Sequence, residues 1–144
     1  MNFKDNELYW FFRRLKFKIE MAFDRFMGSC QRFMRGYSYG DVWSMDCWFI
    51  RTVKPMLVHL RDNHMGVPLE FANNPDGWTD VLDEMINCLT LMDEDNIYEV
   101  IGFGGELDFL DMTIDDYNKM NEIRDQNKDR FFKLFSEYFY NLWD

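Results

Sequence analysis

Carboxylate side chains are the residues of this sequence whose type and spacing could do chemistry. Three groups place acids one helical turn apart: Asp80 with Asp83 and Glu84, Asp108 with Asp111, and Glu122 with Asp125. Acids at this spacing hold Mg²⁺ for phosphate chemistry in all-helical nucleotide pyrophosphohydrolases. The chain lacks the paired, Glu-rich pattern on two consecutive helices that such enzymes use. A metal-dependent nucleotide hydrolase is therefore one alternative hypothesis, beside a self-assembling accessory or structural protein, and we predict no catalytic residue, no metal and no cofactor.

Other reactive patterns are weaker. Asp93, Asp95 and Asn96 resemble the start of a calcium loop. However, Ile97 stands where a third oxygen ligand belongs, and Tyr98 where the turn glycine belongs. No Ser or Cys has a recognisable nucleophile context, and the three cysteines include no C-x-x-C pair for zinc. We expect the cysteines to be small buried residues of a reduced intracellular protein.

Acidic residues are concentrated in one segment. From Asp62 to Asn118 the chain runs 57 residues without Lys or Arg and carries fifteen Asp or Glu, whereas residues 1–61 have a net charge of +5. Charge of one sign over a large surface governs which partners a protein attracts. Acids at i, i+3 and i+4 on a helix lie about 5 to 6 Å apart, comparable with the charge spacing of a nucleic-acid backbone. The candidate partner-binding residues are Asp80, Asp83, Glu84, Asp93, Glu94, Asp95, Glu99, Glu106, Asp108, Asp111, Asp115 and Asp116.

Two interpretations of this acidic segment stay open. It could be a solvated face that keeps an aromatic-rich protein soluble, partly neutralised by Arg13, Arg14, Lys16 and Lys18. It could instead occupy a basic surface of another protein, and this is our prediction because internal pairing cannot remove a net charge of −10. Nucleic acid itself is not an expected ligand, since phosphates would be repelled.

Length and composition predict a single folded domain over residues 1–144. Apolar residues make up 47% and aromatic residues 19% of the chain, which excludes a disordered acidic polymer. We expect no signal peptide and no membrane span, because no apolar stretch is long enough. The expected class is mainly α, a helical bundle of about four major helices with a small irregular insert near residues 97–112.

The four helices are predicted from apolar periodicity and end signals. The first is marked by Leu8, Phe12, Leu15, Ile19, Ala22 and Phe26, spaced 4, 3, 4, 3, 4, with Asp5 or Asn6 as its cap. The second should begin at Asp41, kink or restart at Pro55, and turn inward Met45, Trp48, Phe49, Thr52, Met56 and Leu60. The third should run from about Trp78 to Met92 with Trp78, Leu82, Met85, Ile86 and Leu89 inside. Thr113 and Asp116 form a capping box that opens the last helix, which we expect to reach Trp143.

The first helix is apolar around more than one face. We expect it to be the central helix of the domain, buried on two sides. Alternatively, its second face meets another subunit or a host protein, which makes a homo-oligomer through this helix the open alternative. A membrane-surface helix is disfavoured by the acidity of the rest of the chain.

Part of the sequence resembles a family of small proteins encoded by bacteriophages of Gram-positive and gut bacteria. The resemblance covers about residues 32–90 and rests on the runs GYSYGDVWSMDCWFIRTVKPMLVHLRDNHMGVP and GWTDVLDEMI. Its anchors are Trp43, Asp46, Trp48, Phe49, Pro55, Leu57, Leu60, Arg61, Gly66, Pro68 and Trp78. The resemblance implies a phage origin and the host bacterial cytoplasm, and it carries over no catalytic residue. By analogy with other small acidic phage proteins, we predict an inhibitor that binds a host defence or nucleic-acid-processing protein.

Overall fold

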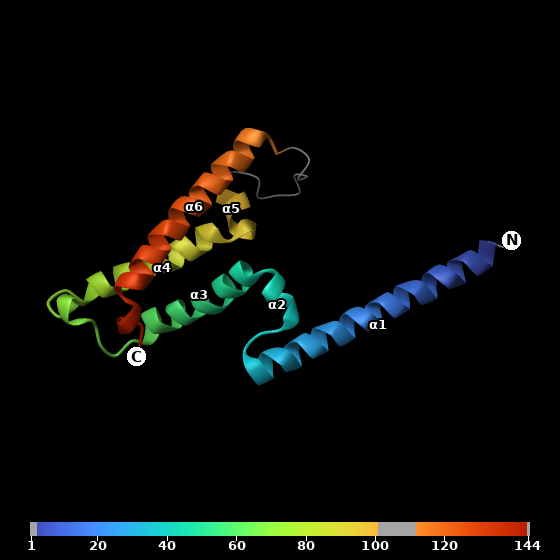
Figure 1. Cartoon of the computed structure of the whole chain (residues 1–144), viewed down its shortest axis with the longest axis horizontal. Helices are drawn as coiled ribbons and strands as arrows, with labels where there is room; N and C mark the ends of the chain where they lie inside the picture. The colour runs from blue at the N-terminus through green and yellow to red at the C-terminus, as the bar shows by residue number, and fades with distance from the viewer. Residues whose placement is uncertain (1–2, 101–111, 144) are drawn as a thin grey trace. The chain divides into compact units, whose positions relative to one another are not determined.

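The chain folds into helices throughout the part that the structure describes. The computed structural model describes residues 3–100 and 112–143, and this part contains no strand (Figure 1). The long helices are α1, α3, α4 and α6, which confirms the predicted mainly α class with four major helices. The chain divides into two compact units, residues 1–48 and 49–144.

The first unit contains α1, which spans Phe3–Arg35. The helix is longer than predicted, and it begins upstream of Asp5 and Asn6, so neither residue is its cap. It ends at Gly36, whose φ of 81° lies in the left-handed region that favours glycine. Its large apolar side chains from Tyr9 to Met27 are at least 41% exposed, so no described element of the first unit buries α1, and its expected place as a buried central helix stays a prediction.

A short helix, α2 (Tyr39–Trp43), follows in the first unit. Ser38, and not Asp41 as predicted, is its N-cap, and Asp41 completes a capping box from the third helical position. The Asp41 carboxylate also accepts a hydrogen bond of 2.9 Å from Arg32 Nε on α1. Hydrogen bonds from Arg32 and Ser38 lower the pKa of Asp41 well below its usual range. This one carboxylate therefore caps α2 and ties it to the end of α1.

Helix α3 spans Met45–Asn63, and the boundary between the units lies within it. It runs through Pro55 without restarting and ends at Asn63. The predicted inner face is partly wrong: Ile50 and Leu57 are the buried residues, whereas Met56 is 65% exposed. Met45, also predicted to face inward, is 67% exposed. Apolar residues occur on both sides of this helix, so periodicity alone could not select the packed side.

Helix α4 (Pro75–Met92) follows a short 3₁₀ turn, η1 (Leu69–Phe71). It starts three residues before the predicted Trp78, because Pro75 is suited to the first helical position. Its predicted end and inner face are confirmed, since Trp78, Leu82, Met85 and Leu89 are buried. Ile86, predicted inside as well, is half-buried. Gly77 approaches η1 so closely that an added Cβ would lie 2.9 Å from Phe71 Cδ1.

Two more helices complete the second unit. Helix α5 spans Glu94–Val100, so the stretch compared with a calcium loop leads into a helix and that alternative is wrong. The predicted capping box of Thr113 and Asp116 is confirmed at the start of α6 (Ile114–Glu137). This helix ends six residues before Trp143, and a 3₁₀ turn, η3 (Phe139–Asn141), follows. The glycine-containing part of the predicted insert, residues 101–111, lies outside the described residues.

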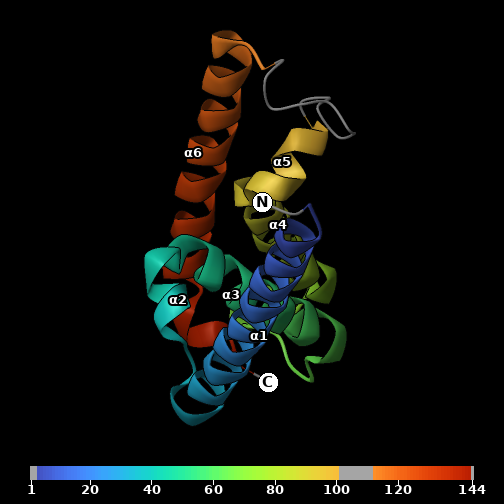
Figure 2. The same cartoon turned by 90° about the vertical axis from the view of Figure 1, so that its right-hand side faces the viewer.

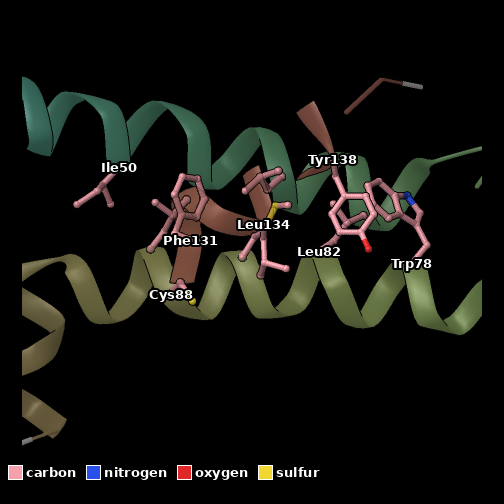
Figure 3. Packing of buried hydrophobic residues seen from close by; sticks show 10 residues of the cluster. Ile50, Trp78, Leu82, Cys88, Phe131, Leu134 and Tyr138 are labelled. Carbon is pink, nitrogen blue, oxygen red and sulfur yellow. The ribbon is translucent and has the colours of Figure 1, made fainter. Parts of the chain in front are cut away.

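The core of the second unit lies between α3, α4 and α6. Helices α4 and α6 lie side by side and run antiparallel, with Trp78 and Tyr138 at one end and Met92 and Arg124 at the other (Figures 1 and 2). The Trp78 and Tyr138 rings lie 5.5 Å apart. Figure 3 shows the buried side chains of this core, among them Ile50, Leu82, Phe131 and Leu134. This packing fixes which side of α4 faces outward.

Candidate functional site

The outer side of α4 carries a row of carboxylates. Asp76, Asp80 and Asp83 lie at intervals of four and three residues, so they share one side of the helix. All three are exposed, because Trp78, Leu82 and Met85 occupy the opposite, buried side. Asp80 and Asp83 were predicted as site residues, and Asp76 was missed although its spacing from Asp80 could have indicated it. We call these three residues the α4 acidic row.

Asp83 is tied to α3 by an arginine. Arg61 Nη1 donates to Asp83 Oδ1 at 2.8 Å, and Arg61 Nε donates to Asp62 Oδ1 at 2.8 Å. The two carboxylates raise the pKa of Arg61, and Arg61 in turn lowers the pKa of Asp62. One guanidinium thus neutralises acids from two helices, which leaves Asp83 less available to a partner than its exposure suggests.

Glu84 is tied to α6 by a second arginine. Arg130 Nε and Nη2 donate to the two Glu84 carboxylate oxygens at 2.5 and 2.8 Å. This fork-shaped pair has the geometry of the stronger charged hydrogen bonds. The hydrogen bonds from Arg130 lower the pKa of Glu84. Glu84 therefore stabilises the packing of α4 against α6.

A third arginine, near the middle of α6, joins this helix to the end of α4 and the start of α5. Arg124 Nε donates to the backbone oxygen of Met92 at 3.1 Å, and its Nη1 donates to Glu94 Oε1 at 2.8 Å. The backbone bond satisfies a carbonyl that the end of α4 leaves without a helical partner. Glu94 is therefore also engaged within the fold.

Two further predicted site residues have local roles. Asp93 accepts a hydrogen bond of 3.2 Å from Asn96 Nδ2. Asp116 accepts from the hydroxyl and the backbone nitrogen of Thr113, and these bonds lower the pKa of Asp116. Asp116 thereby completes the capping box at the start of α6, which is an ordinary structural use of an acid in the first helical turn, and Asp93 holds the Asn96 side chain of α5.

Asp80 and Asp115 remain as exposed acids without such a role. Neither makes a hydrogen bond or an ion pair with another described side chain. The remaining predicted site residues cannot be placed in the same way: the side chains of Asp95 and Glu99 and the whole of Glu106, Asp108 and Asp111 lie outside the described residues. Of the predicted set, the structure brings Asp80, Asp83 and Glu84 together on α4.

The arginines that neutralise these acids differ from the basic residues expected to do so. Arg13, Arg14, Lys16 and Lys18 were expected to offset the acidic segment. Lys16 instead pairs with Glu20 at 3.8 Å, and Arg13 lies 5.2 Å from the centre of the Trp10 ring. The observed partners Arg61, Arg124 and Arg130 flank the acidic segment or lie beyond it in sequence.

An apolar groove lies on the second unit and was not predicted. Its volume is about 610 Å³, and His59 is its only residue with a titratable side chain. Its lining comes from α3 and from the end of the chain: Val53, Pro55, Met56, Leu57, His59, Leu60, Phe135, Phe139, Leu142 and Trp143. Such a lining can hold an apolar side chain or the apolar face of a helix, but it offers little for bond chemistry.

Most of the described acids of the alternative hydrolase hypothesis are engaged by other groups, and Asp80 is the exception. Asp83 and Glu84 bind different arginines, Glu122 accepts from Gln126, and Asp125 accepts from Lys128. Among the described side chains, no three from His, Cys, Asp or Glu lie close enough together to hold a metal ion. The pair Asp108 and Asp111 lies outside this part of the chain.

The comparisons with known proteins add no family. No protein-family model, no curated protein and no solved structure matches this chain. None of the described helices is long and apolar enough to cross a membrane. The function is therefore argued from the charges and contacts above.

Proposed function

We propose that this protein works by binding, and that the acidic surface of its second unit occupies a basic surface of a partner protein. The observation that carries this proposal is the charge left after internal pairing. The second unit has twenty acidic and eight basic residues. Arg61, Arg124 and Arg130 are each used by acids of the fold. A large negative excess therefore remains, with Asp80 exposed at the middle of the α4 acidic row.

The finer form of the proposal follows from the phage resemblance. A phage protein of this charge could inhibit a host defence or nucleic-acid-processing protein by covering the basic surface that would otherwise hold phosphates. The bacterial cytoplasm is the corresponding place of action. Charge complementarity of this kind mainly raises the association rate, and it weakens as salt screens the charges.

Asp80 is the residue with which to test the proposal. Reversing Asp83 or Glu84 would also break their pairs with Arg61 and Arg130, so a loss of binding could reflect a damaged fold. Asp80→Lys changes the same surface without removing a described contact. Asp129→Lys is the matched control, because Asp129 is exposed on α6 and has only a 4.0 Å contact with Lys128.

The experiment is capture from a bacterial lysate on the immobilised protein, followed by elution with a salt gradient. We expect the wild-type protein to retain a basic protein that leaves as the salt rises. The same protein should leave Asp80→Lys at lower salt and should leave Asp129→Lys as it leaves the wild type. Equal retention by all three proteins would contradict the proposed surface.

A second candidate function is that of a self-assembling accessory protein of the virion or the replication machinery. The exposed apolar side chains of α1 favour it, since a helix with such a face is ordinarily covered by a partner. A defined oligomer that includes α1 would support this function.

A further inference from the structure

The apolar residues of α1 follow a heptad pattern that continues past Phe26. The alternating intervals of four and three residues that begin at Leu8 reach Ser29 and Phe33, so the pattern spans between three and four heptads. Residues repeating in this way form the contact line of a coiled coil. We define the α1 seam as the described residues Phe12, Leu15, Ile19, Ala22, Phe26, Ser29 and Phe33.

Every residue of the α1 seam is exposed. The exposed fraction is 58% for Phe12, 61% for Ile19, 64% for Phe26 and 93% for Phe33. A solvent-exposed line of large apolar side chains on one helix is unfavourable in water. No described residue of the first unit therefore covers the α1 seam, and its cover must come from outside this unit.

Helix α2 does not cover the seam. Its contacts with α1 involve Arg32, which binds Asp41, and Gln31, whose side chain accepts a hydrogen bond from the backbone of Tyr39. Neither Gln31 nor Arg32 is a seam residue, and Ser29 and Phe33 stay exposed on either side of them in sequence. The fold of the first unit thus holds α2 on another side of α1 and leaves the α1 seam open.

We infer that the α1 seam is covered by the α1 seam of a second copy, in a parallel and in-register coiled coil. The residues that flank the α1 seam support the parallel orientation. In a parallel pair, the residue just before each of the seam positions Phe12, Ile19 and Phe26 faces the residue five places later on the partner helix. Lys18 then faces Phe23 of the second copy, and Phe11 faces Lys16. Basic side chains meet aromatic rings, and no two like charges face each other.

In the antiparallel arrangement, like charges face each other across the pair. When the two seams overlap fully in that orientation, Lys18 of each copy faces Arg25 of the other, because equivalent flanking positions face each other. Two repulsive contacts result, and no acid lies at these positions to offset them. The charges therefore select the parallel orientation.

The sizes of the seam residues also suit a pair in which each residue packs against the same residue of the other copy. A parallel, in-register pair places the two Phe26 rings in one layer, between a layer of two Ala22 and a layer of two Ser29. Small side chains on either side leave room for the rings to interdigitate. This inference is independent of the acidic surface proposed above, since it involves only the first unit.

The molar mass in solution tests the inference, measured by light scattering over a range of concentrations. We expect the wild-type protein to reach twice its chain mass of 17.6 kDa. Ile19→Asp should raise the dissociation constant of this dimer by about tenfold or more, because it puts a charge in the seam. Phe17→Asp is the matched control: Phe17 is 62% exposed and Ile19 61%, but Phe17 lies off the seam. A 17.6 kDa monomer at all concentrations, or equal effects of the two variants, would overturn the inference.

Cysteine cross-linking tests orientation and register. In a background with Cys30→Ser and Cys47→Ser, Ser29→Cys should form an intermolecular disulfide under mild oxidation, because identical seam positions face each other in a parallel pair. Asp24→Cys, exposed on the outer side of the helix, should not. A dimer that cross-links only when Phe12→Cys is combined with Ser29→Cys is antiparallel, and it would overturn the parallel assignment.

Discussion

Helices α1 and α4 each carry a row of large apolar side chains, and the two rows lie in different environments. Leu82, Met85 and Leu89 on α4 are 0% exposed, whereas Ile19 and Phe26 on α1 are 61% and 64% exposed. Both rows have the spacing of an amphipathic helix, so both must be covered by something apolar. In α4 the cover is α3 and α6 of the same unit. Periodicity thus identifies the side to be covered and leaves the covering element undetermined.

The largest expected effect contrasts a covered aromatic residue with an exposed one. Trp78 is 1% exposed and Phe33 is 93% exposed. We expect Trp78→Ala to lower the free energy of unfolding by about 3 to 5 kcal/mol, because it leaves a cavity beside Tyr138 and Phe71. Phe33→Ala should change it by less than about 0.5 kcal/mol at concentrations where the chain is monomeric. Urea unfolding followed by circular dichroism measures both, and equal effects would remove the distinction between the two rows.

A smaller effect is expected where α4 begins. Gly77→Ala places a Cβ 2.9 Å from Phe71 Cδ1 and 3.1 Å from Asn74 Nδ2, so η1 or α4 must shift. We expect a loss of about 1 to 3 kcal/mol in the free energy of unfolding, typical of an overpacked site. Gly66→Ala is the control, because its added Cβ meets nothing within 4 Å. The same urea experiment applies, and a tolerated Gly77→Ala would show that the contact with η1 is loose.

The smallest effect concerns the charges that join α4 to α6. Arg130→Ala should lower the stability only slightly near neutral pH, by less than Gly77→Ala does, since the pair with Glu84 is partly exposed and screened by solvent. The pKa of Glu84 is lower in the fold than in the unfolded chain. The contribution is therefore fully present above the ordinary pKa of glutamate and is lost as the pH falls through the lowered value.

Unfolding curves of the wild type and Arg130→Ala, measured from neutral to acidic pH, follow this pair directly. The difference between the two proteins should shrink as the solution becomes acidic. Lys128→Ala serves as the control, because Lys128 pairs with Asp125 on the same exposed turn of α6 and does not reach α4. A difference that grows at low pH would contradict the assignment to Glu84.

The sequence predicted the elements that depend on local signals. The inner face of α4 could be predicted because its apolar residues recur on one side only, and the start of α6 because Thr113 and Asp116 form a local motif. The face of α3 could not, since Met56 and Leu57 are adjacent, both apolar, and only tertiary packing distinguishes them. The partners of the acids could not be predicted either: Glu84 and Arg130 are 46 residues apart in sequence.

For the acidic surface too, the sequence predicts the overall charge, whereas the role of each acid depends on its contacts in the fold. The charge of residues 62–118 is visible in the sequence, but the role of each acid depends on which arginine packs beside it. Glu84 and Glu94 stabilise the fold, and Asp80 is left exposed on the α4 acidic row. A mutation test that treats these acids as equivalent would mix loss of stability with loss of binding.

The most direct test of the proposed binding surface is the dissociation constant of the captured basic protein for the wild type, Asp80→Lys and Asp129→Lys, measured at low and at high salt. We predict that Asp80→Lys binds about threefold to tenfold more weakly at low salt, that Asp129→Lys resembles the wild type, and that high salt reduces the difference. Equal dissociation constants for Asp80→Lys and Asp129→Lys, or a wild-type affinity that salt does not change, would contradict binding through the acidic surface.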